Sequence, residues 1–379
     1  MLRIMPLPCR VQPARHLQIV LIDLSSDKAQ RRSHPANRST IVFRGRSGCP
    51  IDPGTSQCNN FPKAGWARHR VAGVLPAVSR RTGTRRRPLS DRSEIVIIDV
   101  HSHAWEYPRH FDESFRSQAR VARAGTEVDL TVNYPDYAAT ASSAEHTIVF
   151  GGKARLSGLW VDDSYVAAYV AQHTDRLIGF LSVDPTQDGW QRELKSGHQD
   201  LGLCGIKLLP MYAGFRPDDP RLDELWSYAG AHSLPVLLHT GTTFIAQAPL
   251  ECTLPRHVDP VATRFPDVKI IMAHLGHPYE AECVAVIRKH PNVYADISAL
   301  HYRPFQLYNS LMLVQEYGVW HKLLFGTDYP FTTVDATLNG LRALNDQVQG
   351  TNLPRLQETQ IEDLIHRDSL KILNLEHAV

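Results

Sequence analysis

The sequence has few cysteines and no cysteine motif for metal binding. Three of its six cysteines occur in the first 58 residues and three after residue 203, and no two stand in a C-x-x-C spacing. This excludes a zinc site built from closely paired cysteines and gives no sign of a disulfide framework. A reducing cytoplasm is therefore the expected location.

The apolar run "LQIVLIDL", residues 17–24, is too short to cross a membrane. A membrane-spanning helix needs about 20 predominantly apolar residues. The run is also not followed by the cleavage pattern of a signal peptide. We therefore expect no membrane partner.

Residues 1–93 have very little negative charge. They contain 18 Lys and Arg against 4 Asp and Glu, and because the whole chain holds 41 basic and 39 acidic residues, the remainder holds 23 and 35. The segment is rich in Arg, Pro and Ser and shows no sustained strand or helix period, so we interpret it as a disordered basic extension. A nucleic-acid arm, a transit peptide and translation from an upstream start are alternatives. For the acidic remainder we expect no nucleic-acid partner.

From residue 94 onward, short aliphatic runs alternate with segments of helical pattern. The runs are nearly continuous, which is typical of strands that are covered on both faces in a parallel sheet. The eight expected strands span residues 94–103, 146–152, 176–185, 203–210, 234–241, 268–276, 292–298 and 321–330.

Two of the intervening segments carry clear helix signals. Residues 219–232 predict a helix in which Asp219 is the cap and Pro220 occupies the first position. Residues 279–291 predict a helix that buries Cys283 and stops before its final proline.

The order of these elements predicts the fold class. Thr359 and Glu362 predict a capping box for one more helix near the C-terminus. Eight buried strands alternating with helices over roughly 285 residues favour a (β/α)8 TIM barrel at residues 94–379. A doubly wound open sheet is the alternative.

Ionisable side chains stand where several of the aliphatic runs end. These residues are His101, His103, Lys207, His239, His274 and Asp328. The pair His101 and His103, taken alone, fits either a metal site or an exposed strand edge. In a barrel, however, the carboxyl ends of the strands meet at one mouth, where three imidazoles and a carboxylate would suit a divalent ion. The recurrence at successive strand ends therefore favours a metal site.

Several segments resemble the amidohydrolase superfamily, and within it the amidohydrolase-related branch that includes aminocarboxymuconate semialdehyde decarboxylase. They are "IDVHSH", "GIKLLPMYAGFRPDDPRLDELWSYAGAHSLPVLLHTG", "FPDVKIIMAHLGHP", "NVYADIS", "LLFGTDYPF" and "LIHRDSLKILNL". They cover residues 94 to about 376 in the order of the family, and residues 1–93 have no counterpart in it.

This resemblance implies a set of roles for the residues at the strand ends. His101, His103, His239 and Asp328 would bind one divalent metal ion, with Zn²⁺ as the first expectation and Mn²⁺ as the alternative. His274 would polarise or protonate the substrate, or orient the nucleophilic water. Asp328 would then be both a ligand and the base.

Lys207 has two interpretations under the resemblance. In two-metal members a carbamylated lysine at the end of strand four bridges the ions, and Lys207, His239 and His274 would form the second site here. In one-metal members a lysine at this place contacts a substrate carboxylate, which we favour. Arg303, in the loop after strand seven, is a second expected substrate contact. Members of the family are often dimers, so a homodimer is the implied assembly.

Five neighbouring residues have weaker signals. Asp99 is expected to bond either a ligand histidine or the backbone, and His277 is interpreted as a loop residue or a ligand's partner, not as a ligand itself. Trp105, Tyr107 and Tyr302 are candidates for substrate contact because their loops overhang the mouth.

The combined pattern predicts a metal-dependent hydrolase. A metal-activated water would attack an ester, amide or lactone bond in a small molecule. Non-oxidative decarboxylation of an aromatic or unsaturated carboxylic acid would use the same residues and is the alternative within enzymes. A barrel that only binds a ligand is the alternative outside them, although the complete set of expected positions argues against it.

Overall fold

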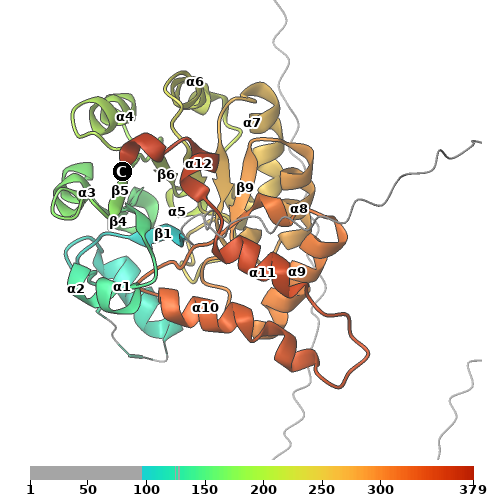
Figure 1. Ribbon diagram of the computed structural model, residues 1–379. Coiled ribbons are helices and arrows are strands. Elements are labelled where there is room, and N and C mark those ends of the chain that lie inside the picture. The colour runs from blue at the N-terminus through green and yellow to red at the C-terminus, as the bar shows by residue number, and fades with distance from the viewer. Residues whose placement is uncertain (1–95, 124, 127–128) are drawn as a thin grey trace, which may run out of the picture. The chain divides into compact units, whose positions relative to one another are not determined.

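The computed structural model describes residues 96–123, 125–126 and 129–379, and the predicted basic extension at 1–93 lies outside this part (Figure 1). In the described part, eight parallel strands form one sheet with the order β1-β2-β5-β6-β7-β8-β9-β10. The strands are Ile98–His103 (β1), His146–Phe150 (β2), Leu177–Ser182 (β5), Ile206–Leu208 (β6), Val236–Leu238 (β7), Ile270–Met272 (β8), Val293–Asp296 (β9) and Leu323–Leu324 (β10).

The two ends of this sheet meet each other. The N–H of Val100 in β1 donates to the Phe325 carbonyl at 3.0 Å, and the N–H of His103 donates to the Tyr329 carbonyl at 2.9 Å. Both acceptors lie just after β10. An open doubly wound sheet would leave these two edges apart, so the predicted TIM barrel is confirmed.

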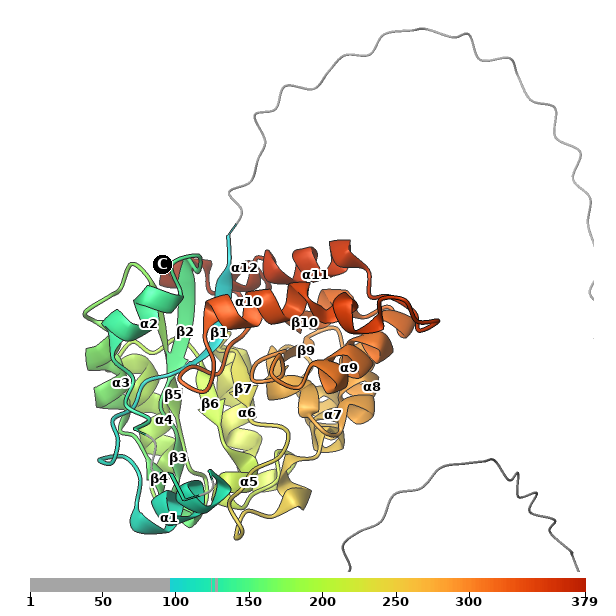
Figure 2. The ribbon, with the colours of Figure 1, turned by 90° about the horizontal axis from the view of Figure 1, so that it is seen from below.

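Helices surround the strands, as Figures 1 and 2 show. They are Glu113–Ala122 (α1), Tyr134–Thr140 (α2), Asp163–Val170 (α3), Trp190–Gln199 (α4), Pro210–Ala213 (α5), Asp223–Ala231 (α6), Val258–Arg264 (α7), Glu280–Lys289 (α8), Pro304–Glu316 (α9), Val334–Arg342 (α10), Glu358–Ile365 (α11) and Ser369–Leu373 (α12). A two-stranded hairpin joins Lys153–Ala154 (β3) to Leu159–Trp160 (β4). None of the helices in the described ranges is long and apolar enough to cross a membrane.

Side chains of one strand alternate between two apolar clusters. Leu237 of β7 belongs to the cluster inside the barrel, whereas its neighbours Val236 and Leu238 pack with the cluster formed by strands and helices. Leu370 and Leu373 of α12 also join the inside cluster. Figure 2 shows α12 at one end of the strands and α1 with α5 at the other. The end near α12 is therefore closed by apolar packing.

The strands are shorter than the apolar runs predicted. The run at 268–276 contains only three strand residues, Ile270–Met272. His274 and Leu275 follow with φ values of +57° and +48°. Left-handed backbone of this kind cannot continue a strand. The apolar run therefore continues into the loop that carries a predicted site residue.

The helix predictions had mixed outcomes. Asp219 accepts a hydrogen bond from the N–H of Arg221, as a cap should, although Pro220 opens a short 3₁₀ turn that leads into α6. The helix with buried Cys283 is confirmed as α8. The capping box of Thr359 and Glu362 is wrong: α11 begins at Glu358, which puts Thr359 inside the helix, and Glu362 pairs with Arg342 instead.

Candidate metal centre and active site

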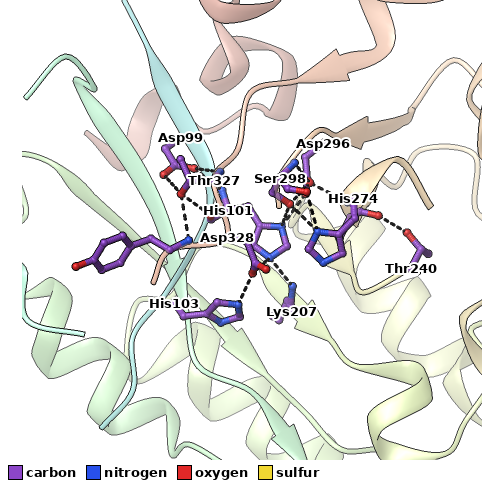
Figure 3. Close-up of polar contacts among 12 residues, drawn as sticks. Asp99, His101, His103, Lys207, Thr240, His274, Asp296, Ser298, Thr327 and Asp328 are labelled. Carbon is purple, nitrogen blue, oxygen red and sulfur yellow. Dashed lines mark hydrogen bonds and ion pairs between the residues drawn. The ribbon is translucent and has the colours of Figure 1, made fainter. Parts of the chain in front are cut away.

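The ionisable residues predicted at the strand ends come together around one cavity. Figure 3 labels all of them except His239. These residues are almost fully buried, with exposed fractions from 1% for Lys207 and His101 to 9% for His274 and Asp328. The group consists of His101 and His103 in β1, Lys207 in β6, and His239, His274 and Asp328 in the segments after β7, β8 and β10.

Asp328 contacts both histidines of β1. Its Oδ1 lies 2.9 Å from His103 Nε2 and 3.2 Å from His101 Nε2. Burial alone would raise the pKa of Asp328, but the hydrogen bonds from the two histidines outweigh burial and hold that pKa well below its ordinary value. The backbone at Asp328 has φ +70°, and its N–H donates to the His101 carbonyl at 2.7 Å. The carboxylate is thus fixed beside β1 and stays ionised.

Asp296, at the end of β9, organises the other side of the cluster, although sequence reasoning gave it no role. Its Oδ2 lies 2.8 Å from His101 Nδ1, and its Oδ1 accepts the backbone N–H of His274 at 2.9 Å. A carboxylate on Nδ1 holds a proton there and turns Nε2 of His101 toward the cluster. Burial would raise the pKa of Asp296, but His101 outweighs it and the pKa is lowered.

His274 is oriented by Ser298, two residues after Asp296. Its Nδ1 lies 3.1 Å from the Ser298 carbonyl and 2.9 Å from the Ser298 hydroxyl. A carbonyl only accepts hydrogen bonds, so Nδ1 carries the proton and Nε2 has the lone pair. Burial lowers the pKa of His274, which keeps the ring neutral.

Lys207 is the buried lysine of the cluster. Its Nζ is 3.4 Å from His101 Nε2 and 4.1 Å from the centre of the Phe150 ring. Burial lowers the pKa of Lys207 to about 7, although Asp328 and Asp296 act in the opposite direction. A lysine in this state is charged only in part at neutral pH.

Two buried imidazole nitrogens in the cluster have no hydrogen-bond partner in the described part of the chain: His239 Nε2 and His103 Nδ1. Burial lowers the pKa of His103 to about 3 and that of His239 well below its ordinary value, so both rings are neutral. Ligand-type atoms of His101, His274 and Asp328 also lie within 4.8 Å of one another. Unpaired buried nitrogens cost free energy, and neutral imidazoles beside a carboxylate are the donor set of a divalent ion. The residues present fit such an ion.

Asp99 bonds the backbone and not a histidine ring. Its Oδ1 accepts the N–H groups of His101 at 3.1 Å and Thr327 at 3.0 Å, and its Oδ2 accepts the Thr327 hydroxyl at 2.7 Å. Burial raises the pKa of Asp99 to about 6. Asp99 therefore joins β1 to the segment after β10 and supports the place where the barrel closes.

Two cavities reach the cluster. The larger has a volume of about 430 Å³ and the smaller, which lies among the histidines, about 60 Å³. His239, His274 and Asp328 line both cavities, so the two meet at these residues. His101 and Lys207 line only the smaller, inner one.

Three of the four remaining residues predicted to contact substrate line one of these cavities. Arg303 and Tyr302 line the larger cavity and are not part of the buried cluster. Trp105 lines the smaller one and stacks on His103, with ring centres 3.8 Å apart. Tyr107 lines neither of the two.

Comparison with protein families found one match in the sequence. A family model described as amidohydrolase matches residues 98–366, which is most of the described chain and includes every residue of the cluster. Comparison with curated proteins found no significant match.

Solved structures share the fold at low sequence identity. An uncharacterized TIM-barrel protein from Bordetella bronchiseptica aligns with a TM-score of 0.53 and 20% identity, covering 74% of this chain and 99% of that one. A 5-carboxyvanillate decarboxylase from Novosphingobium aromaticivorans, complexed with manganese, aligns at 0.51 and 14%, covering 74% and 96%. A probable 2-pyrone-4,6-dicarboxylic acid hydrolase from Acinetobacter baumannii aligns at 0.50 and 15%, covering 73% and 99%.

Proposed function

The chain belongs to the amidohydrolase family, and from this premise we propose that it is a metal-dependent hydrolase of an ester, amide or lactone bond in a small molecule. The observation that carries the proposal is the ionised Asp328 carboxylate, which lies among buried imidazoles where the two cavities meet. Activation of water requires a base next to the space in which the water binds, and Asp328 lines the inner cavity of about 60 Å³.

In the proposed centre, His101, His103, His239 and Asp328 hold one divalent ion. When bound, the ion would lower the pKa of a water molecule toward neutrality and polarise the substrate carbonyl. Zn²⁺ suits this nitrogen-rich set and Mn²⁺ is the alternative, which the manganese in the Novosphingobium enzyme supports at the level of the fold. A second ion held through Lys207 would need a carbamylated lysine, and we favour one ion.

The chain's own residues then perform the proton transfers. Asp328 takes a proton from the attacking water, and its lowered pKa means that the carboxylate is ionised at neutral pH. His274 lies at the junction of the cavities with Nδ1 held by Ser298, so its Nε2 lone pair is free to accept a hydrogen bond from the attacking water and orient it. Lys207 binds an anionic group of the substrate in the smaller, inner cavity, and Arg303 binds one in the larger cavity.

Decarboxylation of an aromatic or unsaturated acid is the second candidate, because one observation favours it. Arg123 and Arg303 both line the larger cavity, whose only carboxylate among the lining residues is Asp328. An excess of cationic side chains suits a substrate that itself bears a carboxylate.

A substrate panel separates the two candidates. Full-length protein loaded with Zn²⁺ or Mn²⁺ would be incubated with lactones, esters and amides while acid release is followed, and with aromatic acids while CO2 is followed. Acid release that stops on chelation and returns with metal supports the hydrolase. CO2 without acid release would replace it with the decarboxylase.

Metal content tests the ligand set independently of any substrate. We expect about one ion per chain, and a value near two would support the bridging role of Lys207 instead. His239→Ala should lower the content, whereas the control His377→Ala, which changes an exposed histidine near the C-terminus, should leave it unchanged. Unchanged metal in His239→Ala would contradict the ligand assignment.

A cytoplasmic location and a homodimer are further proposals. Cys204, Cys252 and Cys283 are all unpaired, which suits a reducing compartment. Sedimentation of the purified full-length protein would test the dimer.

A further inference from the structure

His277 faces the larger cavity from the loop between β8 and α8, outside the inner cluster. It lines the larger cavity but not the smaller one, whereas His274, three residues earlier, lines both. Its Nδ1 lies 2.5 Å from Glu280 Oε1. Within the described ranges no partner is recorded for Nε2, the other ring nitrogen.

Glu280 is itself fixed from two sides. It is the first residue of α8, where the helix dipole favours negative charge, and the Ser310 hydroxyl of α9 lies 3.0 Å from its Oε1. Its side chain is only 14% exposed. Burial would raise the pKa of Glu280, but the hydrogen bond from His277 outweighs burial and the pKa is lowered. An ionised carboxylate therefore holds a proton on Nδ1 and leaves Nε2 of this cavity-lining residue available to a substrate.

We propose that His277 is a further catalytic residue, which gives its Nε2 proton to the leaving group of the substrate. The proposal rests on the hydrolase function proposed above. The geometry divides the work between the cavities: Asp328 and His274 act where the cavities meet, and the leaving group extends into the larger cavity beside His277.

The step balances as a general-acid hydrolysis. The water oxygen bonds to the carbonyl carbon and a water proton passes to Asp328. The bond from that carbon to the leaving oxygen or nitrogen breaks, and the leaving atom takes the Nε2 proton of His277. Before the transfer the ring carries both N–H protons, and its Nδ1–H stays hydrogen-bonded to the Glu280 carboxylate throughout. The proton on Asp328 returns to solvent, and solvent protonates His277 again.

The test is the dependence of rate on leaving group. Metal-loaded, full-length wild type and His277→Gln would be compared on esters of one aromatic acid with alcohols and phenols of increasing acidity. We expect a loss of about 10²-fold to 10⁴-fold for alkyl esters, which need a proton on departure. For the nitrophenyl ester, which leaves unaided, we expect a loss of less than about tenfold. Metal content should stay at the wild-type value.

A second variant and a matched control distinguish a role in proton transfer from a general effect of replacing a buried histidine. Glu280→Gln removes the negative charge beside His277 Nδ1 but keeps His277 itself. It should also lose more rate on alkyl esters than on the nitrophenyl ester, with a smaller loss than His277→Gln. His290→Gln is the control, because His290 also pairs with a carboxylate, Asp259, at 2.6 Å and is equally buried, but lines neither cavity. It should keep the wild-type dependence on leaving group.

The outcomes separate the two proposals. Wild type that hydrolyses none of the esters overturns the hydrolase function, and this inference with it. Wild type that hydrolyses them, while His277→Gln and Glu280→Gln lose rate equally on all esters or not at all, overturns the role of His277 alone.

Discussion

The two ends of the barrel are built from the same strands but have opposite characters. At the mouth, the strand ends carry seven buried ionisable residues, Asp296 included, and the backbone at His274 and Asp328 is left-handed. At the other end, the interior is apolar, and Leu370 and Leu373 of α12 pack against Ile98 and other strand residues. One strand thus begins in an apolar core and ends in a polar site.

This difference suggests how the fold supports its site. Buried charges and left-handed non-glycine residues each cost free energy, so they persist only where the rest of the structure holds them in place. The apolar end contributes that stability through burial. Changes at the mouth should therefore affect chemistry more than folding, and changes at the apolar end should do the reverse.

Asp328→Asn should give the largest effect. It removes the proposed base and charged ligand, so we expect kcat to fall by about 10³-fold or more on any substrate found with the panel. Asn is the matched replacement because it tolerates the left-handed backbone at φ +70° better than Ala does. Thermal melting should change little. A variant that unfolds at room temperature would contradict the division between the two ends.

Leu373→Ala at the closed end should show the opposite pattern. The side chain is fully buried, so its loss should lower the free energy of unfolding by about 2–5 kcal/mol. We expect a fall in Tm of roughly 5–15 °C, measured by circular dichroism. Metal content and kcat well below the Tm should match wild type; loss of metal at unchanged Tm would show that this end also shapes the site.

Asp296→Asn should have a smaller and more selective effect. Asn can keep a hydrogen bond to His101 Nδ1 but lacks the charge that fixes the ring, and such changes typically cost about tenfold to 100-fold in metal affinity. Competition with a chromogenic chelator measures this without any substrate. Ser310→Ala, which removes a buried hydroxyl outside the cluster, is a control that should leave the affinity unchanged. If Asp296→Asn binds the metal as tightly as wild type does, the other contacts of His101 are sufficient to orient its ring.

The fold and most of the cluster were predictable because both follow from local patterns. A strand covered on both faces has a continuous apolar run, and the run stops where a side chain turns into the site, as at His239. Asp296 obeys the same rule at the end of "NVYADIS", so the signal for it was present. Its role was not readable, because its partner His101 lies 195 residues away in the sequence.

Other features depend on backbone geometry, which composition does not encode. The left-handed turns at His274 and Asp328 shorten two predicted strands, and neither residue is a glycine that would have signalled them. The capping box failed for a similar reason, because the start of α11 at Glu358 decides whether Thr359 can cap, and a shift of one residue is enough to prevent it. Side-chain types predicted which residues gather at the mouth, whereas tertiary contacts set where the strands and helices end.

The smallest expected effect concerns the residues before the barrel. The chain enters β1 at the closed end, where Val96 packs against the inside cluster and the Ile97 carbonyl accepts the N–H of Glu145 at 2.8 Å. The family match begins at residue 98, and the composition of 1–93 predicts a dispensable extension. A shortened chain that begins at Arg92 keeps all of these contacts. It should therefore match the full chain in Tm and metal content.

A chain that begins at Asp99 is the control for this shortening. It removes Ile97 and Ile98, whose exposed fractions are 6% and 1%, and so it opens the apolar end while leaving His101 and His103 in place. It should melt at a clearly lower temperature than the chain that begins at Arg92, because burial of these two side chains contributes about 1.5–3 kcal/mol each. If the chain from Arg92 is the one that loses solubility, the prediction that residues 1–93 are dispensable is wrong.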